Sequence, residues 1–232
     1  MAVAAIRTSS LTKDYGAGHG LFDLDLQVSP QEVFGYLGPN GAGKTTTIRL
    51  LMGMIRPTRG SAYVFGLDCV RESVEVKRRV GYVPDVTPEF GSMRGAEIVT
   101  YLAGLRGGVH RDRVRELAER LDLDMGRRHR AYSRADRQKL AIVLALMHDP
   151  QLLILDEPAK DLDERGAAEL HALIDETHED GATILLASRM AAEVERHCDV
   201  VGVLRRGKLS AVMRVEDLRG ELDERSRKAL PP

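Results

Sequence analysis

The stretch Gly38-Pro-Asn-Gly-Ala-Gly-Lys-Thr45 decides the fold of this chain. It follows the apolar run Val33 to Leu37 and precedes a segment with helical spacing, so it fits the glycine-rich P-loop pattern in the required strand-to-helix context. Glycines let consecutive backbone N–H groups turn inward, and the new helix adds the positive end of its dipole. The residues predicted to bind nucleotide phosphates are Gly38, Pro39, Asn40, Gly41, Ala42, Gly43, Lys44, Thr45 and Thr46.

Two side chains of the P-loop have specific predicted roles. Lys44 is expected to bring an ammonium group to the β- and γ-phosphates of ATP, and the Thr45 hydroxyl is expected to ligate Mg²⁺. The plainer alternative is an ordinary glycine-rich turn between a strand and a helix. The complete motif in its proper context favours the nucleotide site.

A second motif, Leu152-Leu-Ile-Leu-Asp156-Glu157, places two carboxylates after a buried strand. In open α/β sheets, ligands bind at the carboxyl ends of the strands. We therefore expect Asp156 to hold the magnesium shell and Glu157 to orient or deprotonate the attacking water. An apolar run before Asp-Glu is also a common strand boundary, and its pairing with the P-loop favours the catalytic interpretation.

Composition indicates one sizeable α/β domain with a small insert in 232 residues. The net charge of −1 creates no general attraction to nucleic acid, so no nucleic-acid partner is expected. The longest apolar stretch, Leu140 to Met147, is far shorter than the roughly 18 residues of a membrane span, and no signal peptide is apparent. A cytoplasmic chain is expected, with reduced thiols at Cys69 and Cys198.

Segments typical of strands alternate with helical segments, which predicts a mostly parallel sheet covered on both faces. The segment 94–125 has helical spacing and no strand-like run, so it is interpreted as a helical insert. The polar residues 223–232 are expected to fray. Strands are predicted over 3–12, 24–28, 33–37, 61–65, 80–83, 152–155, 183–187, 200–204 and 208–212, and helices over 44–54, 136–147, 164–177 and 191–197.

Together with Glu32 to Thr46 and Ile55 to Gly66, these motifs resemble the ABC (ATP-binding cassette) ATPases over 11–212. Within that family the chain resembles the separate ATP-binding subunits of bacterial drug and antibiotic exporters. The resemblance implies a P-loop NTPase with a mostly parallel sheet, an N-terminal antiparallel β subdomain and a helical insert. It divides the single domain 1–232 into a core (1–92 and 148–214), a helical subdomain (93–147) and a C-terminal tail (215–232).

The resemblance also implies partners. A subunit of this kind binds and hydrolyses Mg-ATP and drives export through a separate membrane permease, on the cytoplasmic face of the membrane. It works with a second ATP-binding subunit, as a homodimer or heterodimer. Tyr15 matches the aromatic residue that stacks on adenine, Asp163 matches the D-loop aspartate, and the helical insert with residues 85–93 matches the permease contact.

The signature segment departs from the family pattern. It reads Tyr132-Ser-Arg-Ala-Asp136, and Ala135 replaces a glycine that permits close backbone approach. By resemblance, Ser133, Arg134 and Ala135 contact ATP held on the opposite subunit. Ser133 and Asp136 also fit a simple helix cap of the Ser-x-x-acid type, and the two roles are compatible.

Two further departures lie at the nucleotide of the chain's own P-loop. Asp85 stands where a Q-loop glutamine contacts magnesium and water, although it could be only a loop residue. Arg189 replaces the switch histidine; it could stabilise transition-state charge, or pair with Glu157 and hold that base away from water. We predict intact binding with weak hydrolysis. The alternatives are a nucleotide-gated regulatory or assembly subunit that barely hydrolyses ATP and, less favoured, a soluble family member acting on ribosomes or DNA.

Overall fold

The main sheet has six strands, and a computed structural model describes it within residues 3–217. The strand order is β11-β10-β4-β9-β8-β7, parallel throughout except for the antiparallel β10–β11 hairpin. The predicted mostly parallel sheet is therefore confirmed. Its strands are β4 (Val33–Leu37), β7 (Val80–Val83), β8 (Leu152–Asp156), β9 (Thr183–Ser188), β10 (Val200–Arg205) and β11 (Lys208–Arg214).

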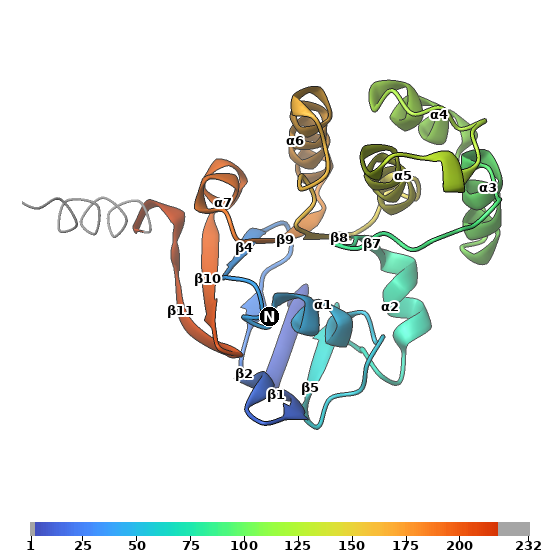
Figure 1. Ribbon diagram of the computed structural model, residues 1–232. Helices are drawn as coiled ribbons and strands as arrows, with labels where there is room; N and C mark the ends of the chain where they lie inside the picture. The colour runs from blue at the N-terminus through green and yellow to red at the C-terminus, as the bar shows by residue number, and fades with distance from the viewer. Residues whose placement is uncertain (1–2, 218–232) are drawn as a thin grey trace, which may run out of the picture.

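A second, antiparallel sheet faces the main one across helix α1 (Lys44–Leu51), as Figure 1 shows. One hydrophobic cluster joins the three layers, with Ile6 from the second sheet, Ile48 from α1 and Ile154 from the main sheet. This arrangement holds the P-loop at the start of α1. The second sheet consists of β1 (Ile6–Gly16), β2 (His19–Leu24), β3 (Gln27–Val28), β5 (Arg59–Val64) and β6 (Leu67–Asp68).

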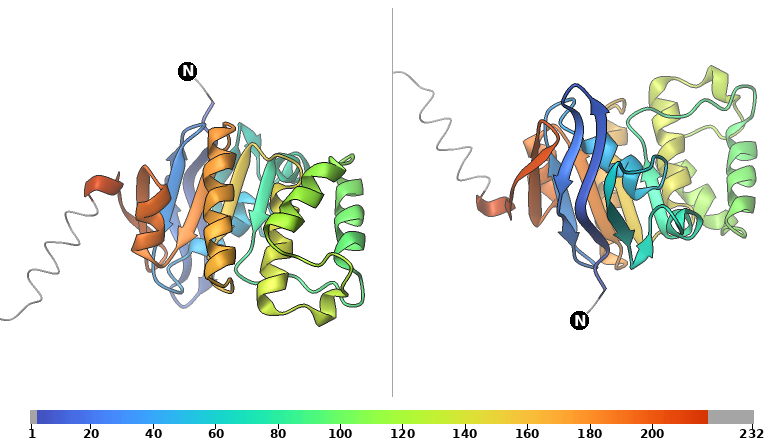
Figure 2. Two further views of the ribbon diagram at one scale, coloured as in Figure 1. Left: turned by 90° about the horizontal axis from the view of Figure 1, so that it is seen from above. Right: turned by 90° about the horizontal axis from the view of Figure 1, so that it is seen from below.

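The opposite face of the main sheet is covered by α5 (Arg134–Leu146), α6 (Glu164–Glu179) and α7 (Ala191–His197). The central strands between these layers are mostly apolar because both faces of the sheet are buried, and every residue of β8 and β9 is buried. Figure 2 shows α3 (Gly95–Leu105) and α4 (Arg111–Arg120) to one side of the sheet, beyond α5.

The predicted helical insert over 94–125 is confirmed, because it contains α3 and α4. The short 3₁₀ helix η1 (His129–Ala131) and α5 follow it. A single hydrophobic cluster runs from Ile98 and Leu117 in the insert through Leu140 to the main sheet. The insert therefore packs onto the core through the helix that follows the signature segment. In the described part of the chain, no helix is long and apolar enough to cross a membrane.

The N-terminal strands differ from the sequence prediction. The predicted strand 24–28 is divided, because β2 ends at Leu24 and β3 is only Gln27–Val28. The intervening Asp25 caps the β1 backbone instead, accepting a hydrogen bond from the Ser10 N–H at 2.8 Å. Register shifts between β1 and β2 disturb the alternation of apolar residues, which explains why β2 was not predicted.

Helix α2 (Ser73–Arg79) was also missed, because Val76 is its one buried side chain and most of its residues are charged. Most other boundaries agree with the prediction within a few residues. The predicted fraying of residues 223–232, and most of the predicted tail 215–232, lie outside the described residues.

Candidate nucleotide-binding site

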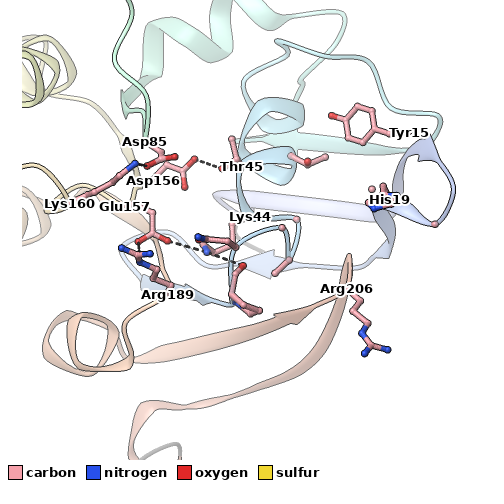
Figure 3. Close-up of a pocket in the computed structure, with 18 residues that line it drawn as sticks. Tyr15, His19, Lys44, Thr45, Asp85, Asp156, Glu157, Lys160, Arg189 and Arg206 are labelled. Carbon is pink, nitrogen blue, oxygen red and sulfur yellow. Dashed lines mark hydrogen bonds and ion pairs between the residues drawn. The ribbon is translucent and has the colours of Figure 1, made fainter. Parts of the chain in front are cut away.

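A cavity of about 690 Å³ lies where β4, β8 and β9 end, at their carboxyl edges. Figure 3 shows two groups of labelled side chains in it. Lys44, Thr45, Asp156 and Glu157 gather at one end with other charged residues, whereas Tyr15 lies at the other end. The residues predicted to bind phosphate and metal are thus brought together in one cavity, except Gly38, which lies just before it. The lining residues are Tyr15, Gly18, His19, Gly20, Pro39 to Thr46, Asp85, Asp156, Glu157, Lys160, Arg189 and Arg206.

The P-loop glycines allow a backbone path that other residues would block. Gly43 has a φ of 113°, and a Cβ at Gly38 would lie 2.7 Å from the carbonyl oxygen of Leu204. Gly43 is also the N-cap of α1, where no side chain accepts a hydrogen bond from the first turn. The N–H groups at the start of α1 therefore remain available to an anion.

Lys44 is 5% exposed, and its ammonium group lies at the floor of the site. It donates a hydrogen bond to the carbonyl oxygen of Gly38 at 2.6 Å. The same nitrogen lies 3.1 Å from Glu157 Oε1, an ion pair that does not satisfy hydrogen-bond geometry. The main cation of the P-loop is thus paired with the predicted catalytic carboxylate.

Asp156 and Thr45 form the candidate metal position. The Thr45 hydroxyl donates to Asp156 Oδ2 at 2.8 Å, whereas Asp156 Oδ1 is buried and has no hydrogen-bond partner among the described residues. Burial raises the pKa of Asp156, the Thr45 hydrogen bond opposes this, and the charges of Asp85 and Glu157 add to the increase. An unpartnered carboxylate oxygen beside a hydroxyl fits Mg²⁺, which prefers hard oxygen ligands.

Glu157 is held in a strained backbone conformation directly after β8. Its φ is 49°, which is unusual for a residue other than glycine, and its N–H donates to the Ala187 carbonyl oxygen at 2.9 Å. The side chain is 14% exposed, and its Oε2 lies 4.0 Å from Nε of Arg189. Arg189 itself is 52% exposed, so this contact lies at the outer limit of an ion pair.

Asp85 lies in the loop after β7 and lines the cavity, and its contact with magnesium stays a prediction. Its Oδ1 accepts a hydrogen bond from Lys160 Nζ at 2.7 Å. Sequence reasoning gave no role to Lys160, and its position in the turn after Glu157 was the one available signal. His19 and Arg206 were also missed, because no motif marks the two hairpins that bring them to the cavity: His19 begins β2, and Arg206 lies in the turn between β10 and β11.

Tyr15 lines the far end of the cavity and is 54% exposed. Its ring lies 5.6 Å from Nζ of Lys13. The aromatic face is accessible to a base, and the adenine contact stays a prediction.

The signature residues Ser133, Arg134 and Ala135 do not line the cavity. Ser133 Oγ accepts from the N–H of Asp136 at 3.1 Å, and Asp136 Oδ2 accepts from the N–H of Ser133 at 3.0 Å. The predicted helix cap is therefore confirmed, and it starts α5. A contact of these residues with ATP on an opposite subunit stays a prediction.

Comparison with known proteins agrees with this geometry. The family model described as ABC transporter matches residues 21–160. A bacitracin transport ATP-binding protein of Enterococcus faecalis is 34% identical, with 96% of this chain and 72% of that protein covered. A daunorubicin resistance ATP-binding protein of Streptomyces coeruleorubidus is 37% identical, with 95% and 72% covered.

Among solved structures, an ATP-binding subunit of an ABC transporter superimposes with a TM-score of 0.85 at 26% identity, covering 94% of this chain and 93% of that one. A cassette bound to ADP and phosphate superimposes with a TM-score of 0.78 at 19% identity, over 90% of this chain and 98% of that one, which shows the shared fold. With the P-loop, the Asp156–Glu157 pair and these matches in agreement, this chain belongs to the ABC transporter family as an ATP-binding subunit.

Proposed function

We propose that the chain binds Mg-ATP in this cavity and hydrolyses it slowly, driving export through a separate membrane permease. The observation that carries the proposal is the convergence of an uncapped helix start, Lys44, the Thr45–Asp156 pair and Glu157 in one cavity. The names of the relatives, which refer to bacitracin transport and daunorubicin resistance, support a drug or antibiotic as the exported compound.

In the binding step, the triphosphate receives hydrogen bonds from the backbone N–H groups of the P-loop and the first turn of α1. Lys44 exchanges its contact with Glu157 for the β- and γ-phosphates, and Tyr15 offers its exposed ring to adenine. Thr45 and Asp156, with Asp85 close by, would hold Mg²⁺ through oxygen atoms. The metal, when bound, neutralises charge on the phosphate oxygens.

In the hydrolytic step, Glu157 accepts a proton from water while the water oxygen attacks the γ-phosphorus and ADP leaves. Release from Lys44 frees Glu157 for this role. Arg189 then limits the rate, because its guanidinium remains close enough to compete with the water for the carboxylate. Slow turnover with intact binding follows from that competition.

The 4.0 Å contact between Arg189 and Glu157 also supports a second candidate function. If the contact tightened into a bidentate pair when nucleotide is bound, Arg189 would occupy both carboxylate oxygens of Glu157 and leave none for the water. The chain would then be a nucleotide-gated regulatory or assembly subunit that barely hydrolyses ATP. Turnover of the Glu157→Gln variant separates the two functions.

The signature segment would contact ATP only when a second ATP-binding subunit presents its own bound nucleotide. Ser133, Arg134 and Ala135 start α5 away from the chain's own cavity, which suits contact with ATP on an opposite subunit. A homodimer and a heterodimer are both compatible with this arrangement. In the division into a core (1–92 and 148–214) and a helical subdomain (93–147), the P-loop belongs to the core and the signature segment to the helical subdomain. The core and the helical subdomain share one hydrophobic cluster.

The permease would dock beside the insert, which would place the chain peripherally on the cytoplasmic face of the membrane. A groove of about 500 Å³ there is lined by Met52, Tyr82, Pro88, Phe90 and Leu102, with Lys77 and Arg106 among its basic residues. It includes part of the predicted contact region 85–93. Apolar side chains such as Val86, which is 75% exposed, support a protein partner on this face.

The test is steady-state ATP hydrolysis by the chain purified with its native permease, comparing the unmodified protein with Glu157→Gln. Slow phosphate release that is almost abolished by the substitution supports the proposal. Equal rates in the two proteins would contradict hydrolysis by this chain. ATP binding measured on the same preparations shows whether the site is intact.

A further inference from the structure

Lys160 and Asp85 connect two loops at the edge of the nucleotide cavity. Asp85 follows β7 and Lys160 follows β8, and these strands are parallel neighbours, so their following loops meet. Lys160 Nζ donates to Asp85 Oδ1 at 2.7 Å, and both residues line the cavity.

Three carboxylates, Asp85, Asp156 and Glu157, share this end of the cavity. Lys44 faces Glu157 at 3.1 Å, and the Thr45 hydroxyl donates to Asp156. Within residues 3–217, Lys160 is the one side chain that forms a hydrogen bond with Asp85. A triphosphate entering here would therefore meet an uncompensated charge if Lys160 were absent.

We propose that Lys160 is a positioning residue that neutralises Asp85 and fixes it at the rim, so that a magnesium-bound triphosphate can enter beside the three carboxylates. The inference rests on the proposed function of the cavity. Lys160 acts through Asp85 and needs no contact with the phosphate. Its turn leads directly to Asp163, the N-cap of α6, so the pair also ties the loop after β7 to the start of that helix.

Calorimetric titration with ATP and with ADP, each with magnesium, tests this role in four proteins: the unmodified chain, Lys160→Met, Asp85→Asn and the double variant. Lys160→Met should bind ATP about five- to tenfold more weakly, the effect of removing one screened positive charge close to a polyanion. The loss should be smaller for ADP, which carries less negative charge. The double variant should bind ATP as well as Asp85→Asn does, because Lys160 acts only through the carboxylate that Asp85→Asn removes.

The matched control is Arg115→Met. It removes an ion pair of similar length, 2.8 Å to Asp112, on the exposed surface of α4, and it should not change ATP affinity. Thermal unfolding without nucleotide checks that the variants fold; Lys160 lies 43% exposed in a turn, and Lys160→Gln provides a second substitution that removes the charge.

Unchanged ATP affinity in Lys160→Met and Lys160→Gln would overturn the inference. A double variant that binds ATP more weakly than Asp85→Asn would also overturn it, because Lys160 would then act without Asp85, by direct contact with phosphate. If the unmodified chain bound no ATP, the proposed function would fail together with this inference. If the unmodified chain bound ATP and the Lys160 variants bound it equally well, this inference would fail while the proposed function would stand.

Discussion

Lys44 Nζ lies 3.1 Å from Glu157 Oε1, so the cation that is proposed to hold the phosphates is paired with the carboxylate that is proposed to activate water. The two groups are 5% and 14% exposed, which strengthens their interaction relative to a surface pair. Each must leave the other before ATP can be bound and hydrolysed. Nucleotide binding would therefore release the catalytic carboxylate, which connects the two halves of the site.

Replacement of Glu157 by Gln should lower the rate of ATP hydrolysis by about 100-fold or more, the usual contribution of a general base. ATP affinity should stay equal or increase, since Lys44 loses its competing carboxylate. Turnover and calorimetric affinity measured on one preparation check both effects. A weaker ATP affinity would show that Glu157 does not compete for Lys44.

Replacement of Arg189 by His should raise turnover several-fold, because the permanent charge that competes for Glu157 is removed and a neutral donor remains. Steady-state phosphate release checks this prediction, with Arg196→His on α7 as a control outside the cavity. Turnover that stays the same or falls would instead favour Arg189 as a group that stabilises the transition state.

Replacement of Asp156 by Asn should stabilise the nucleotide-free chain by a few degrees in Tm while weakening the magnesium-dependent part of ATP binding. The reason is that burial raises the pKa of Asp156, so its charged form costs stability at neutral pH in the absence of a metal. Thermal unfolding and titrations with and without magnesium measure the two effects. A lower Tm combined with unchanged magnesium dependence would contradict the assignment of Asp156.

Stability should fall as the pH decreases from about 6.5 to about 4, in part because of His148. Burial, with the nearby charge of Arg106, lowers the pKa of His148 from 6.5 to about 4. The unfolded chain therefore takes up a proton in this window before the folded chain does, which destabilises the fold by on the order of 1–3 kcal/mol. Chemical unfolding at several pH values should show a smaller decrease for His148→Gln, and an identical decrease would exclude His148 as a cause.

The sequence predicted structure correctly where a short segment contains all the residues that determine its conformation. The P-loop and the strand before Asp156 were predicted correctly because glycine geometry and a continuous apolar run are local properties. The cavity contact of Lys160 depends on how two loops meet across parallel strands, which no local pattern records. Strand β2 was missed for a related reason, since its pairing with β1 is interrupted by register shifts.

The choice between the two roles of Ser133 shows the same limit. The Ser-x-x-Asp spacing predicted the cap of α5, and the cap is present. A contact with a second subunit would involve atoms outside this chain, so its own sequence and structure place Ser133 on a surface without naming the partner.

The most direct test of the central claim is isothermal calorimetry of the chain with ATP and magnesium, beside the Lys44→Ala variant. The structure predicts measurable ATP affinity in the unmodified chain and its loss in Lys44→Ala, because Lys44 is the buried cation at the P-loop. Thermal unfolding without nucleotide confirms that both proteins are folded. A folded, unmodified chain that shows no ATP affinity, or a Lys44→Ala variant that binds ATP equally well, would contradict this account of the site.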